Sequence, residues 1–203
     1  MSLPIFLICF IVFAIWLRVK MKRGNSGKED LDAFLERENQ ANFARKQDIS
    51  HLDYLSVNPD DLPFVDSDDP KEISLQNEVK KSGERKMIDL SAYTNTDLKE
   101  KYGPANLEEL SDCDQSYLLF TRNLSLWGTY VYEKEDYTRA KIIMEYAKSI
   151  GSDISSVYTT LGNIYAREGD FHKVDALIAE VENSDFALKT SILKTLKLLK
   201  LEY

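Results

Sequence analysis

The sequence predicts an all-α protein with an N-terminal single transmembrane helix, an extended acidic linker and a C-terminal array of antiparallel helix pairs. Three observations predict this fold class. The first seventeen of the 203 residues carry no charge. Beyond residue 73, helix cap signals punctuate the chain without strand-like alternation. Apolar residues near the C-terminal end also recur at a constant interval. With 43% hydrophobic and 30% charged residues, the chain fits one modest domain plus appendages.

Residues 1–23 are predicted to form a membrane anchor with a basic flank. Residues 3–17 read LPIFLICFIVFAIWL, and Val19 and Met21 extend this run past Arg18. A spanning helix needs about 17–25 apolar residues, so the run is long enough if Arg18 reaches the interface. Pro4 falls in the first turn, where a missing N–H costs little.

The anchor is expected to stay uncleaved and to hold the rest of the chain in the cytoplasm. No basic residue precedes the run, no small-residue cleavage site follows it, and Cys9 lies in its middle, so secretory and lipoprotein signals do not fit. The basic residues lie on the C-terminal side. They are Arg18, Lys20, Lys22, Arg23 and Lys28. Positive charge stays inside, which predicts a single-pass cell-membrane protein with its N-terminus outside.

Residues 24–47 are predicted to contain a juxtamembrane helix. After the Gly24-Asn25-Ser26-Gly27 break, an amphipathic stripe recurs near helical spacing. It consists of Leu31, Phe34, Leu35, Glu38 and Ala41. The pattern fits a solvated spacer helix and a docking helix equally well.

Residues 48–72 are predicted to be an acidic, extended segment. Eight acidic residues stand against Lys71, and Pro59, Pro63 and Pro70 prevent a continuous helix. Seven large apolar residues interleave with the acids, so the segment either lies on the C-terminal domain as an ordered strap or forms a disordered tether. They are Leu52, Tyr54, Leu55, Val57, Leu62, Phe64 and Val65.

Residues 73–203 are predicted to form one helical domain. Cap signals include Thr94-Asn95-Thr96, Gly103-Pro104 and Asn106. Within this domain SLWGTYVYEKEDYTRAKIIMEYA aligns with TTLGNIYAREGDFHKVDALIAEV at a constant interval of 34 residues. The interval pairs Trp127 with Leu161, Gly128 with Gly162, Val131 with Tyr165, Asp136 with Asp170, Tyr137 with Phe171, Ala140 with Val174, and Met144 with Ile178.

This pattern resembles the tetratricopeptide repeat over residues 119–184, with residues 188–203 as an end helix. Val131, Val174 and the missing closing prolines depart from the family pattern. The two glycines are expected to let the helices of a pair approach closely, and Asp136 and Asp170 are expected to cap the second helix of each pair. Two copies are fewer than such arrays need, so residues 73–118 are expected to supply further packing surface.

Few residues suggest chemistry. His51 and His172 lie in no metal-ligand spacing, and no Gly-rich phosphate loop is present. Cys113 lies between Asp112 and Asp114, which oppose thiolate formation, so we expect a buried or inert thiol. The sequence therefore predicts no catalytic residues, metal or cofactor, and no enzyme. A net charge of −8 and a pI near 4.9 disfavour nucleic acid as a partner.

The resemblance implies a groove that holds an extended peptide or helix of another protein. Its peptide-facing positions carry over to Arg122, Ser125, Thr129, Tyr132, Thr159, Asn163 and Arg167. Thr159 stands where carboxylate-clamp members carry Lys, so binding of a C-terminal carboxylate is not expected. The same positions also fit an ordinary polar helix face.

These observations predict a membrane-tethered cytoplasmic adaptor that binds a partner protein through the groove and contacts lipid through residues 1–23. The alternative is a structural accessory subunit of a membrane complex, contacting that complex through its transmembrane helix. Replacing the anchor separates the two, because an adaptor tolerates an unrelated anchor.

Overall fold

The computed structural model describes Phe10, Phe13, Trp16 and residues 30–202. Apart from those three aromatic residues, the predicted anchor lies outside the described residues. No helix in the described part of the chain is both long enough and apolar enough to span a bilayer.

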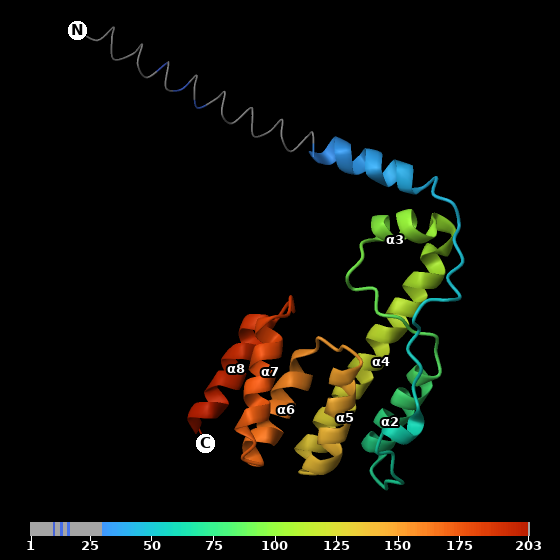
Figure 1. Ribbon diagram of the computed structural model, residues 1–203. Helices are drawn as coiled ribbons and strands as arrows, with labels where there is room; N and C mark the ends of the chain where they lie inside the picture. Colours follow the sequence, from blue (N-terminus) through green and yellow to red (C-terminus); the bar gives the residue numbers. More distant parts are fainter. Residues whose placement is uncertain (1–9, 11–12, 14–15, 17–29, 203) are drawn as a thin grey trace, which may run out of the picture. The chain divides into compact units, whose positions relative to one another are not determined.

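The described chain is all-α, as predicted. Residues 30–41 are helical, and the later elements are η1 (Pro59–Asp61), α2 (Pro70–Gly83), α3 (Asn95–Tyr102), η2 (Pro104–Asn106), α4 (Leu107–Glu133), α5 (Tyr137–Ser149), α6 (Ser155–Arg167), α7 (Phe171–Glu182) and α8 (Lys189–Glu202) (Figure 1). The described residues contain no strand, although Leu55 and Met87 form an isolated antiparallel bridge.

The chain divides into two compact units that are each built from separate segments. The first unit contains the described part of Met1–His51 together with Ser91–Glu108. The second contains Leu52–Leu90 and Glu109–Tyr203. Residues 91–108, which the sequence analysis placed in the C-terminal domain, thus belong with helix 30–41.

In the first unit, charged side chains join helix 30–41 to α3. The Arg37 guanidinium donates to Asp97 at 2.6 Å and to Glu100 at 2.6 and 2.9 Å. One turn on, Glu38 accepts hydrogen bonds from Lys99 and from the Thr96 hydroxyl. These contacts join residues about sixty positions apart in the sequence, so they hold the two segments of the first unit together.

The predicted cap signals around α3 are used in two ways. Thr94 forms a reciprocal capping box with Asp97 at the start of the helix. Asn106, predicted from sequence as a cap signal, donates its side-chain amide to the Gln47 and Tyr102 carbonyls at 2.8 and 2.7 Å. The Gln47 N–H also donates to the Tyr102 carbonyl at 3.0 Å. The end of α3 is therefore hydrogen-bonded to the chain that follows helix 30–41.

Gly103 allows the end of α3 to approach the backbone of Arg45 and Lys46 closely. Its φ of +86° is in the region that favours glycine, and a Cβ here would lie 2.8 Å from the backbone of Arg45 and Lys46. A side chain at this position has neither the backbone conformation nor the space it needs.

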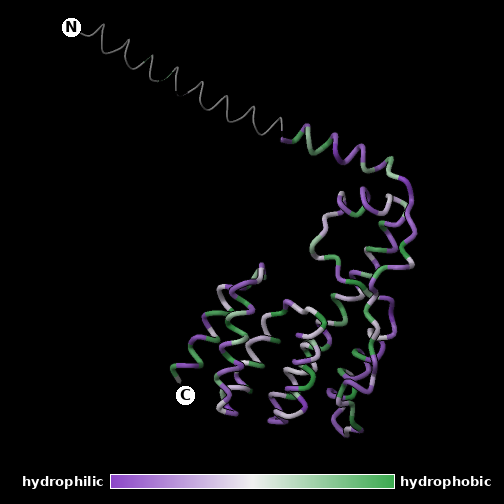
Figure 2. The backbone as a smooth tube through the Cα atoms, viewed as in Figure 1, coloured by the Kyte–Doolittle hydropathy of each residue, from purple (hydrophilic) through white to green (hydrophobic). Residues whose placement is uncertain are grey.

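In the second unit, α4 to α8 surround one apolar core. Hydrophobic and hydrophilic residues interleave along each helix (Figure 2), which leaves one face of each helix for the core. Trp127, Leu161 and Ile192 are fully buried in the same cluster on α4, α6 and α8. Asp136 and Asp170 accept from the backbone N–H of Arg139 and Lys173, so they cap α5 and α7 as expected.

The two glycines of the predicted repeats face different helices. A Cβ at Gly128 would meet Met144 and Ile143 of α5, the second helix of its own pair. A Cβ at Gly162 would instead meet Leu196 and Leu199 of α8. The expectation that both glycines bring the helices of a pair together therefore holds for Gly128 and not for Gly162. The leucines of α8 occupy the space that Gly162 leaves open.

Residues 52–69 form an ordered strap on the core of the second unit. Leu62 is buried, and the Phe64 ring stacks on Trp127 with centroids 5.0 Å apart and planes 9° from parallel. The Val65 backbone exchanges two hydrogen bonds with the Gln76 amide, at 2.9 and 3.1 Å. The strap thus covers the large side chain that α4 would otherwise expose.

The strap ends where Asp69 caps α2. The Asp69 carboxylate accepts from the Lys71 N–H at 3.0 Å, from the Tyr130 hydroxyl and from Lys134 at 3.1 Å. The Tyr130 and Lys134 contacts lower the pKa of Asp69 to about 2. This carboxylate therefore joins the start of α2 to the end of α4.

Candidate functional site

The solvent-facing side of α4 is the strongest candidate for a binding surface. Leu118 and Leu126, two turns apart, are 51% and 49% exposed, and Arg122 lies between them on the same face. If a partner covered these leucines, burying their apolar surface would stabilise the complex by about 25 cal/mol per Å². We name this surface the α4 face, defined by Leu118, Arg122, Leu126 and Thr129.

The α6 residues predicted for the groove are partly used within their own helix. The Thr159 hydroxyl donates to the Ser155 carbonyl at 3.1 Å, and the Asn163 amide donates to the Thr159 carbonyl at 2.8 Å. Both side chains remain half-buried. The Asn163 amide oxygen is still oriented by this contact, since one end of the amide is fixed.

Ser125 does not line a surface. It is buried, and its hydroxyl lies 2.5 Å from the Ser156 hydroxyl of α6. This predicted groove residue therefore joins α4 to α6. Its equivalent on α6, Thr159, is more exposed.

Two of the predicted residues, Tyr132 and Arg167, both contact the aromatic ring of Tyr137. The Tyr132 ring packs edge-on against Tyr137 of α5, with centroids 5.3 Å apart. The exposed Arg167 guanidinium lies over the same Tyr137 ring at 4.2 Å. The structure thus gathers Tyr132, Tyr137 and Arg167 from three helices. Such a cluster of aromatic rings and arginine is the composition that dominates binding energy at protein interfaces.

Tyr137, Leu118 and Leu126 were missed as site residues by sequence reasoning. Tyr137 was considered only as a position of the repeat, paired with Phe171, and Leu118 and Leu126 were not singled out. Their helical positions carried the missing signal, since Leu118, Arg122 and Leu126 fall on one side of α4 while Phe120, Leu124 and Trp127 fall on the buried side.

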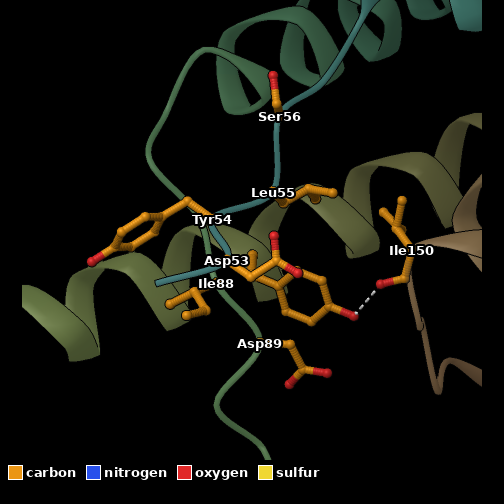
Figure 3. Close-up of a pocket in the computed structure, with 8 residues that line it drawn as sticks. Asp53, Tyr54, Leu55, Ser56, Ile88, Asp89 and Ile150 are labelled. Carbon is orange, nitrogen blue, oxygen red and sulfur yellow. Dashed lines mark hydrogen bonds between the residues drawn. The ribbon is translucent and has the colours of Figure 1, made fainter. Parts of the chain in front are cut away.

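A separate pocket of about 410 Å³ lies beside Tyr117 in the second unit. Figure 3 shows Ile150 facing Leu55 across it, with Asp53 and Asp89 at its edge. The Tyr117 hydroxyl donates to the Ile150 carbonyl at 3.0 Å. Burial and the neighbouring carboxylates raise the pKa of Tyr117 well above its usual value. The hydroxyl therefore stays protonated and hydrogen-bonded to the carbonyl, so Tyr117 does not supply a nucleophile to the pocket.

Cys113 is buried, as expected from its sequence context. Burial is the largest cause of a raised thiol pKa, and Glu109 and Asp112 act in the same direction. A thiol in this environment is a poor nucleophile. Among the described residues, no three His, Cys, Asp or Glu side chains are placed to hold a metal ion.

Comparison of the chain with protein-family models, curated proteins and solved structures finds no match.

Proposed function

We propose that the protein is a membrane-tethered cytoplasmic adaptor whose tetratricopeptide-like helix pairs hold a partner protein on the α4 face and the adjoining part of α6. The observation that carries the proposal is the exposure of Leu118 and Leu126 on either side of Arg122. A partner helix or extended peptide that covers this face removes two leucines from water and meets a positive charge between them.

The constant interval supports a tetratricopeptide-like array. Asp136 and Asp170 cap their helices with similar backbone angles, and each follows a residue with positive φ, Glu135 at +66° and Gly169 at +75°. Helices α5 and α7 begin 34 residues apart, and α4 and α6 end 34 residues apart. Such an interval supports two copies of one helix–turn–helix unit. The packing of the strap and α2 on Trp127 and α4 supplies the additional surface that two copies need.

Attachment to a membrane would allow a weak binding face to be effective. The apolar run at residues 3–17 and the basic residues after it favour an anchor with the helical units in the cytoplasm. Confinement to a membrane surface raises the effective concentration of a membrane-bound partner, so a small interface is sufficient.

Photo-crosslinking of the full chain in its host membrane tests the proposal. A benzophenone amino acid replaces Thr129 on the α4 face or, as the control, the exposed Ala176 on α7. We expect one discrete adduct from position 129 and none from position 176. The adduct is expected to disappear in a Leu118→Ser, Leu126→Ser variant and to persist in Ile142→Ser, which changes an exposed apolar side chain of α5 (41% exposed).

Equal adducts from both positions would remove the α4 face from the proposal. Replacing residues 1–23 with an unrelated anchor then separates adaptor from accessory subunit. An adaptor keeps the position-129 adduct after this exchange, whereas a subunit that is recognised through its transmembrane helix loses it.

A further inference from the structure

Helix 30–41 in the first unit carries a second uncovered apolar face. Leu31, Phe34 and Leu35 are 54%, 53% and 53% exposed. They lie on one side of the helix, because their spacing of three and four residues matches its turn. A patch of three large side chains is unusual on a helix whose remaining surface is polar.

This face continues an existing contact. Glu38 and Ala41 follow on the same side of the helix at the next two turns. Glu38 is held by Lys99 and Thr96 of α3, and Ala41 is buried. Figure 1 shows the first turns of the helix lying beyond α3. Within the first unit, one half of the face is thus covered and the half nearer the N-terminus is left uncovered.

The uncovered half has an acidic surround. Asp30 and Asp32 flank the apolar residues on either side, and Glu36 lies on the opposite surface; all three are exposed. The charge of Arg37 is already shared between Asp97 and Glu100. The face therefore offers apolar contact surrounded by negative charge.

This charge pattern indicates which kind of partner can bind the face. Helices that lie in a lipid interface carry Lys and Arg on their polar side, and this helix carries acids there. Two copies of the helix would bring like charges together. A helix with an apolar stripe flanked by Lys or Arg matches both features of the face.

We propose that Leu31, Phe34 and Leu35 form a docking face for a basic amphipathic helix of another protein. Membrane proteins concentrate Lys and Arg beside the cytoplasmic ends of their transmembrane helices, so this is the class of segment that the face fits. The inference does not use the α4 face, and its test leaves that face unaltered.

Disulfide trapping on the full chain in nanodiscs tests the face. The chain carries Cys9→Ser and either Leu35→Cys on the face or Phe43→Cys outside the helix as the control, since Phe43 is more exposed at 82%. Cys113 is buried and reacts slowly. The probe is an 18-residue Leu/Lys amphipathic peptide with one terminal cysteine. A Leu/Glu peptide of the same pattern and a scrambled Leu/Lys peptide are its controls.

We expect the Leu/Lys peptide to trap position 35 about tenfold faster than position 43, as for a binding preference of about 1.4 kcal/mol. The two control peptides are expected to show no such preference, and Leu31→Ser with Phe34→Ser is expected to abolish it. Equal trapping at both positions, or equal trapping by the Leu/Glu peptide, would overturn the proposal.

The same cysteine distinguishes the competing occupants. A fluorophore on position 35 that is quenched by brominated lipid would place the face in the bilayer. A disulfide between two chains at position 35 without peptide would assign the face to a second copy. Either result contradicts docking of a basic partner helix, and neither bears on the adduct at Thr129.

Discussion

The two compact units are stabilised in different ways. The second unit buries a continuous apolar cluster that includes Trp127, Leu161 and Ile192, and the strap adds an aromatic stack to it. The described apolar side chains buried in the first unit are Ala41, Ile49, Leu98 and Tyr102, and charged hydrogen bonds join its segments. Apolar burial depends little on pH and salt, whereas exposed ion pairs depend on both. We therefore expect the first unit to unfold before the second at high salt, or when the pH falls below the lowered pKa values of its carboxylates.

The largest expected effect tests the apolar unit. Trp127→Ala removes a fully buried ring and its stack on Phe64, and we expect a loss of about 3–5 kcal/mol in the free energy of unfolding. Leu126→Ala, next to it and half-exposed, is expected to change stability by less than about 0.5 kcal/mol. Denaturant unfolding of the second unit measures both. Similar losses from the two variants would show that the α4 core is not packed as described.

The next effect tests the junction of the first unit. Gly103→Ala forces a side chain into positive φ and against the backbone of Arg45 and Lys46, and we expect a loss of about 2 kcal/mol. Gly169→Ala has positive φ with open space around it, so about 1 kcal/mol is expected there. Hydrogen exchange at the Gln47 N–H, which donates to Tyr102, reports the first loss. Unchanged protection of Gln47 would contradict the role given to Gly103.

A smaller effect tests the ion pairs directly. Bonds from Lys99 and Thr96 lower the pKa of Glu38, and bonds from Thr94 and Arg37 lower the pKa of Asp97. Carboxylates with lowered pKa stabilise the folded state above their unfolded pKa, and this stabilisation is lost as pH falls through the folded pKa. We expect Glu38→Gln to reduce protection of the first unit about two- to fivefold at pH 7. The difference should vanish below the folded pKa of Glu38, while core amides of the second unit stay protected.

The smallest effect applies the same logic inside the second unit. Because Tyr130 and Lys134 hold the pKa of Asp69 near 2, Asp69→Asn should lower the melting temperature slightly at pH 7. Its effect should fade between about pH 4 and pH 2, as the wild-type carboxylate takes up a proton. Thermal unfolding across this pH range measures the difference. Asp68→Asn, an exposed neighbour, serves as the control.

Local signals in the sequence predicted much of the helical structure. Thr94 and Asp97 form the expected capping box, and Asp136 and Asp170 begin α5 and α7, because capping depends on residues three positions apart. Pro70 was grouped with the extended segment, although it opens α2, since proline is as acceptable in a first helical turn as in an extended chain.

Contacts between segments far apart in the chain could not be predicted from the sequence. The Phe64 stack on Trp127 joins positions 63 residues apart, and any of the seven apolar residues of the strap fits the same pattern. Arg37 finds Asp97 and Glu100 among many acidic residues of equal charge. The need for glycine at position 103 comes from Arg45 and Lys46, which no local rule connects to it. For the candidate site, sequence identified Tyr132 and Arg167 but not the Tyr137 ring that brings them together.

The chain passes between the two units three times, after His51, Leu90 and Glu108. During synthesis, helix 30–41 therefore leaves the ribosome well before Asp97, Lys99 and Asn106, the residues that hold it and the chain that follows it. In that interval Glu38 lacks the Lys99 and Thr96 side chains that hold it in the folded chain. Ribosome-stalled chains that end before Asn106 should thus engage chaperones, and chains long enough to release α3 and η2 should escape them.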